Sequence, residues 1–345
     1  MKRFLGIAVL CGLLLAAAWF GWRQYETSVL DRPIAGLDAP QVYEIPDGAS
    51  LTAVAAGLEK RGLLDRSGAW LRHARRRGDA TRIKAGEYEI RPGTTPAQLL
   101  AQFVAGDVRL HALTIPEGFT TRQALALIQA HPQVVSELAG LPDEVWMERA
   151  GFGKRHPEGQ FFPDTYRFPR GTTDRELLRL AHARLERELA DAWERRAPGL
   201  PIATPYEALI LASIVEKETG APDERPLIAG VFANRLRMGM RLQTDPSVIY
   251  GLGQSFDGNL RRRDLLADTP YNTYTRAGLP PTPIALPGRA ALEAAVRPAR
   301  TDAIYFVATG RGDGRHFFAE TLVAHNENVS RHLSNLRGGS GVQVR

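Results

Sequence analysis

The sequence predicts an α+β protein in three successive parts: an N-terminal transmembrane helix, a small α/β module and a larger mixed α+β domain. An uncharged apolar run covers residues 4–22. Short alternating segments, each followed by a turn and a helical pattern, recur between residues 42 and 118, and longer helical patterns follow. The length of 345 residues allows two or three domains of ordinary size.

The apolar run predicts an uncleaved membrane anchor. It has about 19 residues, which is enough to span a hydrocarbon core as a helix. Trp19, Phe20 and Trp22 stand where interfacial aromatic residues belong, and they extend the run beyond a signal-peptide cleavage site at residues 16–18. The basic residues within 1–3 predict a cytoplasmic N-terminus, with the rest of the chain on the other side of the membrane.

The small module is expected at residues 42–108, after a polar linker at 23–41. Its pattern reads strand, helix, helix, strand, with helices from Leu51 and from about residue 66. This order and size resemble the LysM module, a small fold that binds wall glycans. A spacer without a ligand is the alternative.

The larger domain is expected at residues 109–337, before a disordered tail at 338–345. Its first strand closes on a turn at residues 115–118, which repeats the chemistry of two earlier turns. Further elements are predicted as a helix at 174–196, a hairpin between 303 and 319, and a last helix at 321–336.

Composition excludes several classes of function. Cys11 is the only cysteine and lies in the apolar run, so thiol catalysis and cysteine metal sites are excluded from the soluble region. The eight histidines show no metal-ligand spacing, and neither a metal nor another cofactor is predicted. The net charge of +6 comes with arginine clusters at 72–77 and 261–263 but with no nucleic-acid motif, so both clusters read as solvated faces.

A buried helix ending near Glu216 organises the larger domain. Thr204 to Glu207 has the form of a capping box, with proline at the first helical position. The residues that follow are apolar on every side. Glu216 and Glu218 each continue an apolar row at the last turn, where burial and the negative end of the helix dipole both raise a carboxyl pKa.

A carboxyl group that keeps its proton near neutral pH can act as a general acid. The alternative is that one of these glutamates forms a structural ion pair with Lys217 or Arg235. The loops after the helix are rich in amide, hydroxyl and phenol groups, which suit a cleft for a neutral, hydroxyl-rich ligand such as a sugar.

Three segments carry a family resemblance: SIVEKET (213–219), NRLRMGMRLQTDPSVIYG (234–251) and TPYNTYTRAGLPPTPIALPG (269–288). They resemble the endolytic murein transglycosylases, the YceG-like family. The resemblance implies that Glu216 is the catalytic acid/base. It implies cleavage of the MurNAc-GlcNAc bond within peptidoglycan strands, with the C6 hydroxyl of the substrate as nucleophile and a 1,6-anhydro end as product. It also suggests a single-pass inner-membrane protein with a periplasmic catalytic region and peptidoglycan synthases (penicillin-binding proteins) as partners.

The remaining site residues are predicted to bind substrate: Glu158, Gln160, Glu218, Gln243, Thr244, Asp245, Tyr250, Tyr271, Asn272 and Tyr274. Glu158 and Gln160 belong to a loop that resembles the family pattern EGxxFPDTY, which reads either as a sugar-binding wall or as a buried aromatic cluster. Two other functions stay open. Glu216 and Asp245 could form the carboxylate pair of a hydrolase, although Asp245 also suits a helix N-cap. The chain could also be a wall-binding scaffold without activity.

Overall fold

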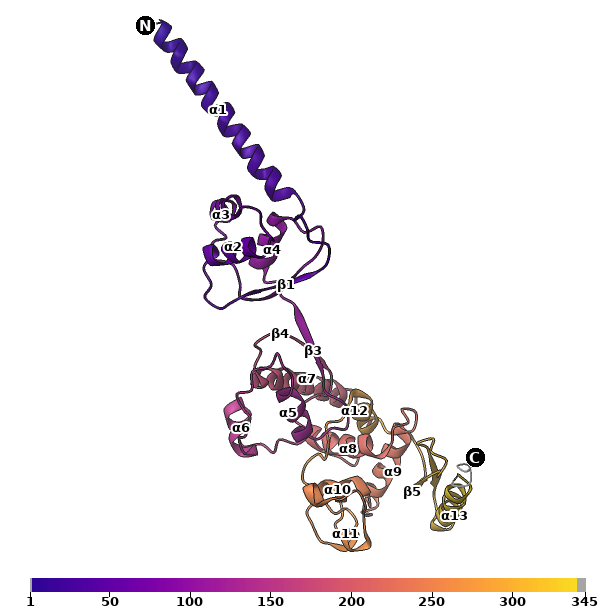
Figure 1. Ribbon diagram of the computed structural model, residues 1–345. Helices are drawn as coiled ribbons and strands as arrows, with labels where there is room; N and C mark the ends of the chain where they lie inside the picture. The colour runs from indigo at the N-terminus through magenta and orange to yellow at the C-terminus, as the bar shows by residue number, and fades with distance from the viewer. Residues whose placement is uncertain (1, 340–345) are drawn as a thin grey trace, which may run out of the picture. The chain divides into compact units, whose positions relative to one another are not determined.

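The computed structural model describes residues 2–339 and divides into two compact units. The first unit comprises Met1–His111 with Arg167–Gly171, and the second comprises Ala112–Tyr166 with Thr172–Arg345. Figure 1 labels the elements of each unit along the chain. The first division falls between His111 and Ala112, and the short segment Arg167–Gly171 belongs to the first unit.

The first unit begins with the long helix α1 (Lys2–Asp31). The linker predicted from residue 23 is helical as far as Asp31, because the end of α1 packs on the small module. Glu26 is 1% exposed and accepts hydrogen bonds from Arg72 and Arg76 at 2.6 and 2.8 Å. No helix in the described part of the chain is long and apolar enough to cross a bilayer.

The small module has the predicted order of strand, helix, helix, strand. Strands β1 (Gln41–Ile45) and β2 (Gly86–Ile90) pair antiparallel, with Gln41 opposite Ile90. Helices α2 (Leu51–Lys60) and α3 (Ser67–Arg76) lie between them in sequence, and α4 (Pro96–Ala105) follows. Their buried faces form one core with the strands, and its largest members include Trp70, Tyr88 and Phe103. The likeness to LysM itself stays a prediction.

Strands β3 (Leu110–Thr114) and β4 (Thr165–Pro169) form a second two-stranded sheet. The division between the two units falls within both strands.

The second unit is mainly helical, and its helices begin where the sequence places its caps. Thr120, Thr173 and Thr204 each close a capping box with the side chain three residues later. The helices are α5 (Thr121–Gln129), α6 (Asp143–Ala150), α7 (Asp174–Glu194), α8 (Pro205–Glu218), α9 (Arg225–Arg237), α10 (Asp245–Leu252), α11 (Arg262–Leu266), α12 (Arg289–Val296) and α13 (Leu322–Gly339).

The core of this unit surrounds α8. Every residue from Ala208 to Val215 is buried, as the all-round apolar pattern predicts. The helix packs against α7, α9, α10 and α12, so its last turn is held from several sides.

Two further expectations are resolved at the edges of this unit. Phe161 and Phe162 are buried, and Phe161 packs against Trp146 and Phe152, so the aromatic part of the 158–166 loop is a buried cluster and not a sugar-binding wall.

Strands β5 (Tyr305–Ala308) and β6 (His316–Ala319) form the predicted hairpin. Helix α13 continues through residues 338–339, which were expected to be disordered; residues 340–345 lie outside the described part of the chain.

Candidate active site

The last turn of α8 directs three consecutive side chains to three different neighbours. Successive residues of a helix point about 100° apart, so Glu216, Lys217 and Glu218 cannot share one environment. Lys217 donates from Nζ to the carbonyl oxygen of Gly118, in the turn before α5, at 3.2 Å. The two glutamates therefore need separate descriptions.

Glu216 forms a buried ion pair. Its side chain is 5% exposed, and Oε1 lies 3.2 Å from Nη2 of Arg225, which is itself 11% exposed. Oε2 accepts a hydrogen bond from the backbone N–H of Gly288 at 3.0 Å. Both oxygens thus have protein partners, and these tie the end of α8 to the beginnings of α9 and α12.

Glu117 joins this ion pair from the turn before α5. Its Oε2 lies 3.8 Å from Arg225 Nη2, and its carboxyl group occupies the space that a side chain at position 288 would need. Burial and the negative charge of Glu216 raise the pKa of Glu117. No local sequence pattern marks Glu117 or Arg225 as site residues, because their pairing with Glu216 brings together distant parts of the chain.

Glu218 has a different environment, although it lies only two residues from Glu216. It is partly exposed, and no arginine, lysine or histidine among residues 2–339 forms an ion pair with it. Burial raises the pKa of Glu218 to about 7, and the nearby charge of Asp245 acts in the same direction. The Thr244 hydroxyl and the charge of Arg235 oppose that shift.

Arg235 does not neutralise Glu218 by direct contact. Its guanidinium group donates to the carbonyl oxygens of Ile304 and Leu242 at 2.6 and 2.7 Å. Of the two ion-pair partners proposed from the sequence, Lys217 and Arg235, neither pairs with a glutamate of this turn in the described structure, and Arg225 does.

Two loops that are distant in sequence form the wall beside Glu218. Gln243 donates its backbone N–H to the carbonyl of Thr273, and Thr244 donates to the Thr273 hydroxyl, at 3.1 and 3.0 Å. Gln243 has a φ of +50°, which is unusual for a residue with a Cβ, and its side chain is exposed. The Thr244 hydroxyl is buried and has no partner of hydrogen-bonding geometry among the described residues, although it lies close enough to Glu218 to lower its pKa.

Asp245 is the first residue of α10 and not its N-cap. Thr244 occupies the N-cap position. The Asp245 carboxylate is exposed, and its Oδ1 accepts a hydrogen bond from the Tyr274 hydroxyl at 2.6 Å. Burial and this bond raise the pKa of Tyr274, so the phenol stays a donor. Asp245, Tyr274 and Gln243 are thus available beside Glu218.

Asn272 supports this wall from inside. It is 1% exposed, its amide nitrogen donates to three backbone carbonyls, and its oxygen accepts from the N–H of Tyr274. These contacts use its polar atoms within the protein, so its predicted contact with substrate has no support from this geometry.

A second polar group consists of Tyr250, which belongs to α10, with Tyr271 and Glu158. The rings of Tyr250 and Tyr271 meet edge to face at 4.9 Å, and the Tyr271 hydroxyl lies 2.9 Å from that of Thr282. Glu158 is 4% exposed and accepts from the backbone N–H of Thr121, at the start of α5, at 2.9 Å. Burial raises its pKa to about 7.

Among residues 2–339, no three histidine, cysteine or acidic side chains come together as metal ligands would. Two carboxyl groups at this end of α8 have raised pKa values: Glu218, at about 7, and Glu117. Hydroxyl and amide groups lie on the side of Glu218.

The comparisons with known proteins connect this site to a family. The model of the YceG-like family matches residues 43–331, which is most of the chain. The chain belongs to the YceG-like family. An endolytic murein transglycosylase of Bacillus subtilis is 31% identical over 308 residues, with 84% of each chain covered. An endolytic murein transglycosylase of Streptococcus pneumoniae is 29% identical over 370 residues, which cover 97% of this chain and 66% of the relative. A crystal structure of a yceG-like protein from Listeria monocytogenes has a TM-score of 0.52 and 30% identity, covering 84% of this chain and 98% of that one.

Proposed function

We propose that the protein is an endolytic lytic transglycosylase of peptidoglycan, and that Glu218 is its general acid and base. The family and the names of its relatives support the activity. The observation that favours Glu218 is its pKa of about 7 at a partly exposed side chain near Thr244 and Asp245.

A carboxyl group with this pKa suits both halves of the reaction. In its protonated form it donates to the glycosidic oxygen as the bond to the anomeric carbon breaks. As a carboxylate it then accepts the proton of the C6 hydroxyl, whose oxygen forms the new bond to the anomeric carbon. The proton count balances, because Glu218 ends protonated as it began. One carboxyl group is sufficient because the nucleophile belongs to the substrate.

Glu216 is the residue that the family resemblance suggested, and the geometry favours its neighbour. Both oxygens of Glu216 are occupied by Arg225 and by the backbone N–H of Gly288, and its side chain is almost inaccessible. We assign it a positioning role: it fixes the end of α8, and with it Glu218.

Asp245 keeps a hydrolase as the second candidate function. Its negative charge is near enough to contribute to the raised pKa of Glu218, so the two carboxyl groups belong to one site. Against this role, its Oδ1 is held by the Tyr274 hydroxyl, and we assign the pair Asp245–Tyr274 to substrate binding together with Gln243.

The N-terminal helix is proposed as a membrane anchor with the catalytic unit on the periplasmic side. Along α1, the apolar side chains that the structure describes are exposed, including Leu13 at 63% and Leu15 at 72%. Trp19 and Trp22 are exposed as well, at 61% and 56%, and suit an interface. Glycan binding by the small module, and an association with peptidoglycan synthases, remain part of the proposal.

Product analysis tests the activity. The full chain in detergent is incubated with purified, uncrosslinked peptidoglycan strands, and the products are separated and weighed. Internal cuts that leave 1,6-anhydro ends are expected. Strands that remain uncut with a folded protein would favour the scaffold function, and free reducing ends would favour the hydrolase.

A further inference from the structure

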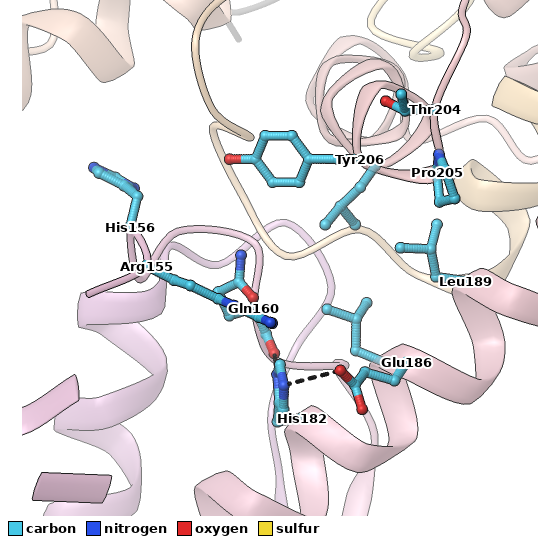
Figure 2. Close-up of a pocket in the computed structure, with 11 residues that line it drawn as sticks. Arg155, His156, Gln160, His182, Glu186, Leu189, Thr204, Pro205 and Tyr206 are labelled. Atoms are coloured by element: carbon cyan, nitrogen blue, oxygen red, sulfur yellow. Dashed lines mark hydrogen bonds and ion pairs between the residues drawn. The ribbon is translucent and has the colours of Figure 1, made fainter. Parts of the chain in front are cut away.

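A cavity of about 540 Å³ lies at the opposite end of α8 from Glu218. Loop 155–160, helix α7 and the first turn of α8 line it, as Figure 2 shows, and it is open to solvent. Its volume is in the range of small-molecule sites, which is roughly 300–1,000 Å³. Tyr206 and Glu218 are separated by 12 residues of helix, or about 18 Å along the axis.

Gln160 places a polar side chain in the wall of this cavity. The residue is 7% exposed, yet its side-chain amide makes no hydrogen bond within residues 2–339. The backbone of Gln160 is fixed, because its carbonyl oxygen accepts from His182 Nδ1 at 2.8 Å. In Figure 2 the amide points into the space on the side where Tyr206 lies. The amide is therefore available to pair with a ligand or with water in this space.

The other walls combine apolar and aromatic side chains with polar and charged ones, namely Arg155, His156, His182 and Glu186. Leu185 and Leu209 are buried in the cavity wall, and Leu189 continues it along α7. Tyr206 is 39% exposed and offers a ring face beside them. A group that suits these walls has a small alkyl part for the leucines and both a donor and an acceptor for Gln160. A secondary amide with a methyl group meets both requirements.

A row of tyrosines connects the cavity to the active site. Burial and the nearby Tyr271 together raise the pKa of Tyr206. Tyr271 in turn packs on Tyr250, and Tyr250 belongs to α10, whose first residue is Asp245 beside Glu218. Of these rings, Tyr206 is exposed, so it can stack on a sugar ring and donate to its hydroxyl groups.

We infer that the cavity is a distant subsite that binds the acetamido group of an N-acetylated sugar in the glycan strand. The Gln160 amide pairs with the N–H and C=O of that group, the leucines contact its methyl group, and Tyr206 stacks on the sugar ring. The assignment rests on the glycan substrate proposed above. It adds a binding contact with the strand at a distance from the bond that is cut.

Calorimetric titration with an N-acetylglucosamine tetramer tests the subsite without cleavage. The protein is the full chain in detergent carrying Glu218→Gln, and the comparison adds Gln160→Leu, which keeps size but removes both hydrogen bonds. Two neutral hydrogen bonds are worth roughly a tenfold change in Kd, so Gln160→Leu is expected to weaken binding by about that factor. Leu180→Ala, at an exposed position of α7 outside the cavity, is the control and should bind as before. If Gln160→Leu lowers the unfolding temperature of the protein, Tyr206→Ala serves as the second probe.

The fully deacetylated tetramer supplies the decisive comparison. It should bind less tightly to the parent protein, and Gln160→Leu should then cause little further loss. Equal binding of the acetylated tetramer with and without Gln160→Leu, or no binding of it at all, overturns the subsite.

Peptide stems also contain secondary amides, so peptidoglycan strands are compared with and without stems. An effect of Gln160→Leu that requires the stems would assign the cavity to the peptide and overturn the sugar assignment. Cleavage by the unsubstituted protein is measured separately. An uncut strand with intact Gln160-dependent binding would contradict the proposed function alone.

Discussion

Arg225 Nη2 lies 3.2 Å from Glu216 Oε1, and this ion pair distinguishes the two glutamates at the end of α8. Glu216 is held by a cation and a backbone N–H, whereas Glu218 is partly exposed, has no ion-pair partner in the described structure and has a raised pKa. The distinction leads to opposite expectations for two substitutions that are chemically identical.

Glu218→Gln is expected to reduce cleavage at least about 10²-fold, because glutamine cannot transfer a proton as an acid does. It should not destabilise the fold. Glu216→Gln should retain measurable cleavage but destabilise the protein, by up to roughly 3–5 kcal/mol, since it leaves the partly buried Arg225 with only the longer ion-pair contact to Glu117, at 3.8 Å, in the described part of the chain. Cleavage rates and thermal unfolding of both variants decide the matter. Loss of activity confined to a stable Glu216→Gln protein would return the catalytic role to Glu216.

The pH dependence of cleavage should reflect Glu218. Its acid form starts the reaction, and burial raises its pKa to about 7, so kcat/KM is expected to fall as the pH rises through about 7. A carboxyl group with an ordinary pKa would place this fall well below pH 6. Rates measured from pH 5 to pH 9, with unfolding followed at each pH, give the comparison.

Glu158 should make stability depend on pH in the same range. Its pKa is about 7 in the folded protein and near 4.5 when unfolded, so the folded state binds more protons between these values. Its contribution is therefore most favourable below about pH 4.5 and is lost as the pH rises to about 7. Glu158→Gln keeps the acceptor for Thr121 and removes the charge. We expect it to raise the unfolding temperature at pH 8 and to have little effect at pH 5. Equal shifts at both pH values would contradict the raised pKa.

The local elements of this fold follow from short sequence patterns. The helices predicted at 174–196 and after Thr204 begin at Asp174 and Pro205, and the threonine before each closes a capping box with a glutamate three residues later. The extension of α1 to Asp31 could not be predicted in this way. It depends on Glu26 meeting Arg72 and Arg76, which lie 46 and 50 residues away.

The site shows the same limit. The buried helix, its acidic end and the polar loops opposite it were all predicted from the sequence, and the structure places Thr244 and Asp245 beside Glu218. The choice between the two glutamates could not be made from α8 alone, because the N–H that holds Glu216 belongs to Gly288, 72 residues further on. Both glutamates end equally apolar rows in sequence, and only tertiary contacts separate them.

The N-terminal segment is expected to remain on the mature protein. Apolar side chains of α1 such as Leu13 and Leu15 are exposed. The end of α1 is joined to the small module through Glu26 and through Arg72, whose guanidinium group lies over the ring of Trp22. Intact mass of the protein from the membrane fraction measures this directly. A mature chain that begins near Trp19 would contradict the anchor.

The fate of the broken bond separates the transglycosylase from the hydrolase. An oriented intramolecular hydroxyl can have an effective molarity of roughly 10⁵ M or more, far above the concentration of water, so the C6 hydroxyl should capture the anomeric carbon. Asp245 is not needed as a second carboxylate in that case. Asp245→Asn is expected to keep the 1,6-anhydro product, because asparagine can still accept a hydrogen bond from the Tyr274 hydroxyl. Only the affinity for the strand should fall. Cleavage in ¹⁸O-labelled water, followed by mass analysis, should therefore show no label in the new glycan ends that either protein produces. The unsubstituted protein could instead produce glycan strands with label at their reducing ends, and Asp245→Asn could lose this product together with its activity. That result would establish hydrolysis with Asp245 as the second carboxylate.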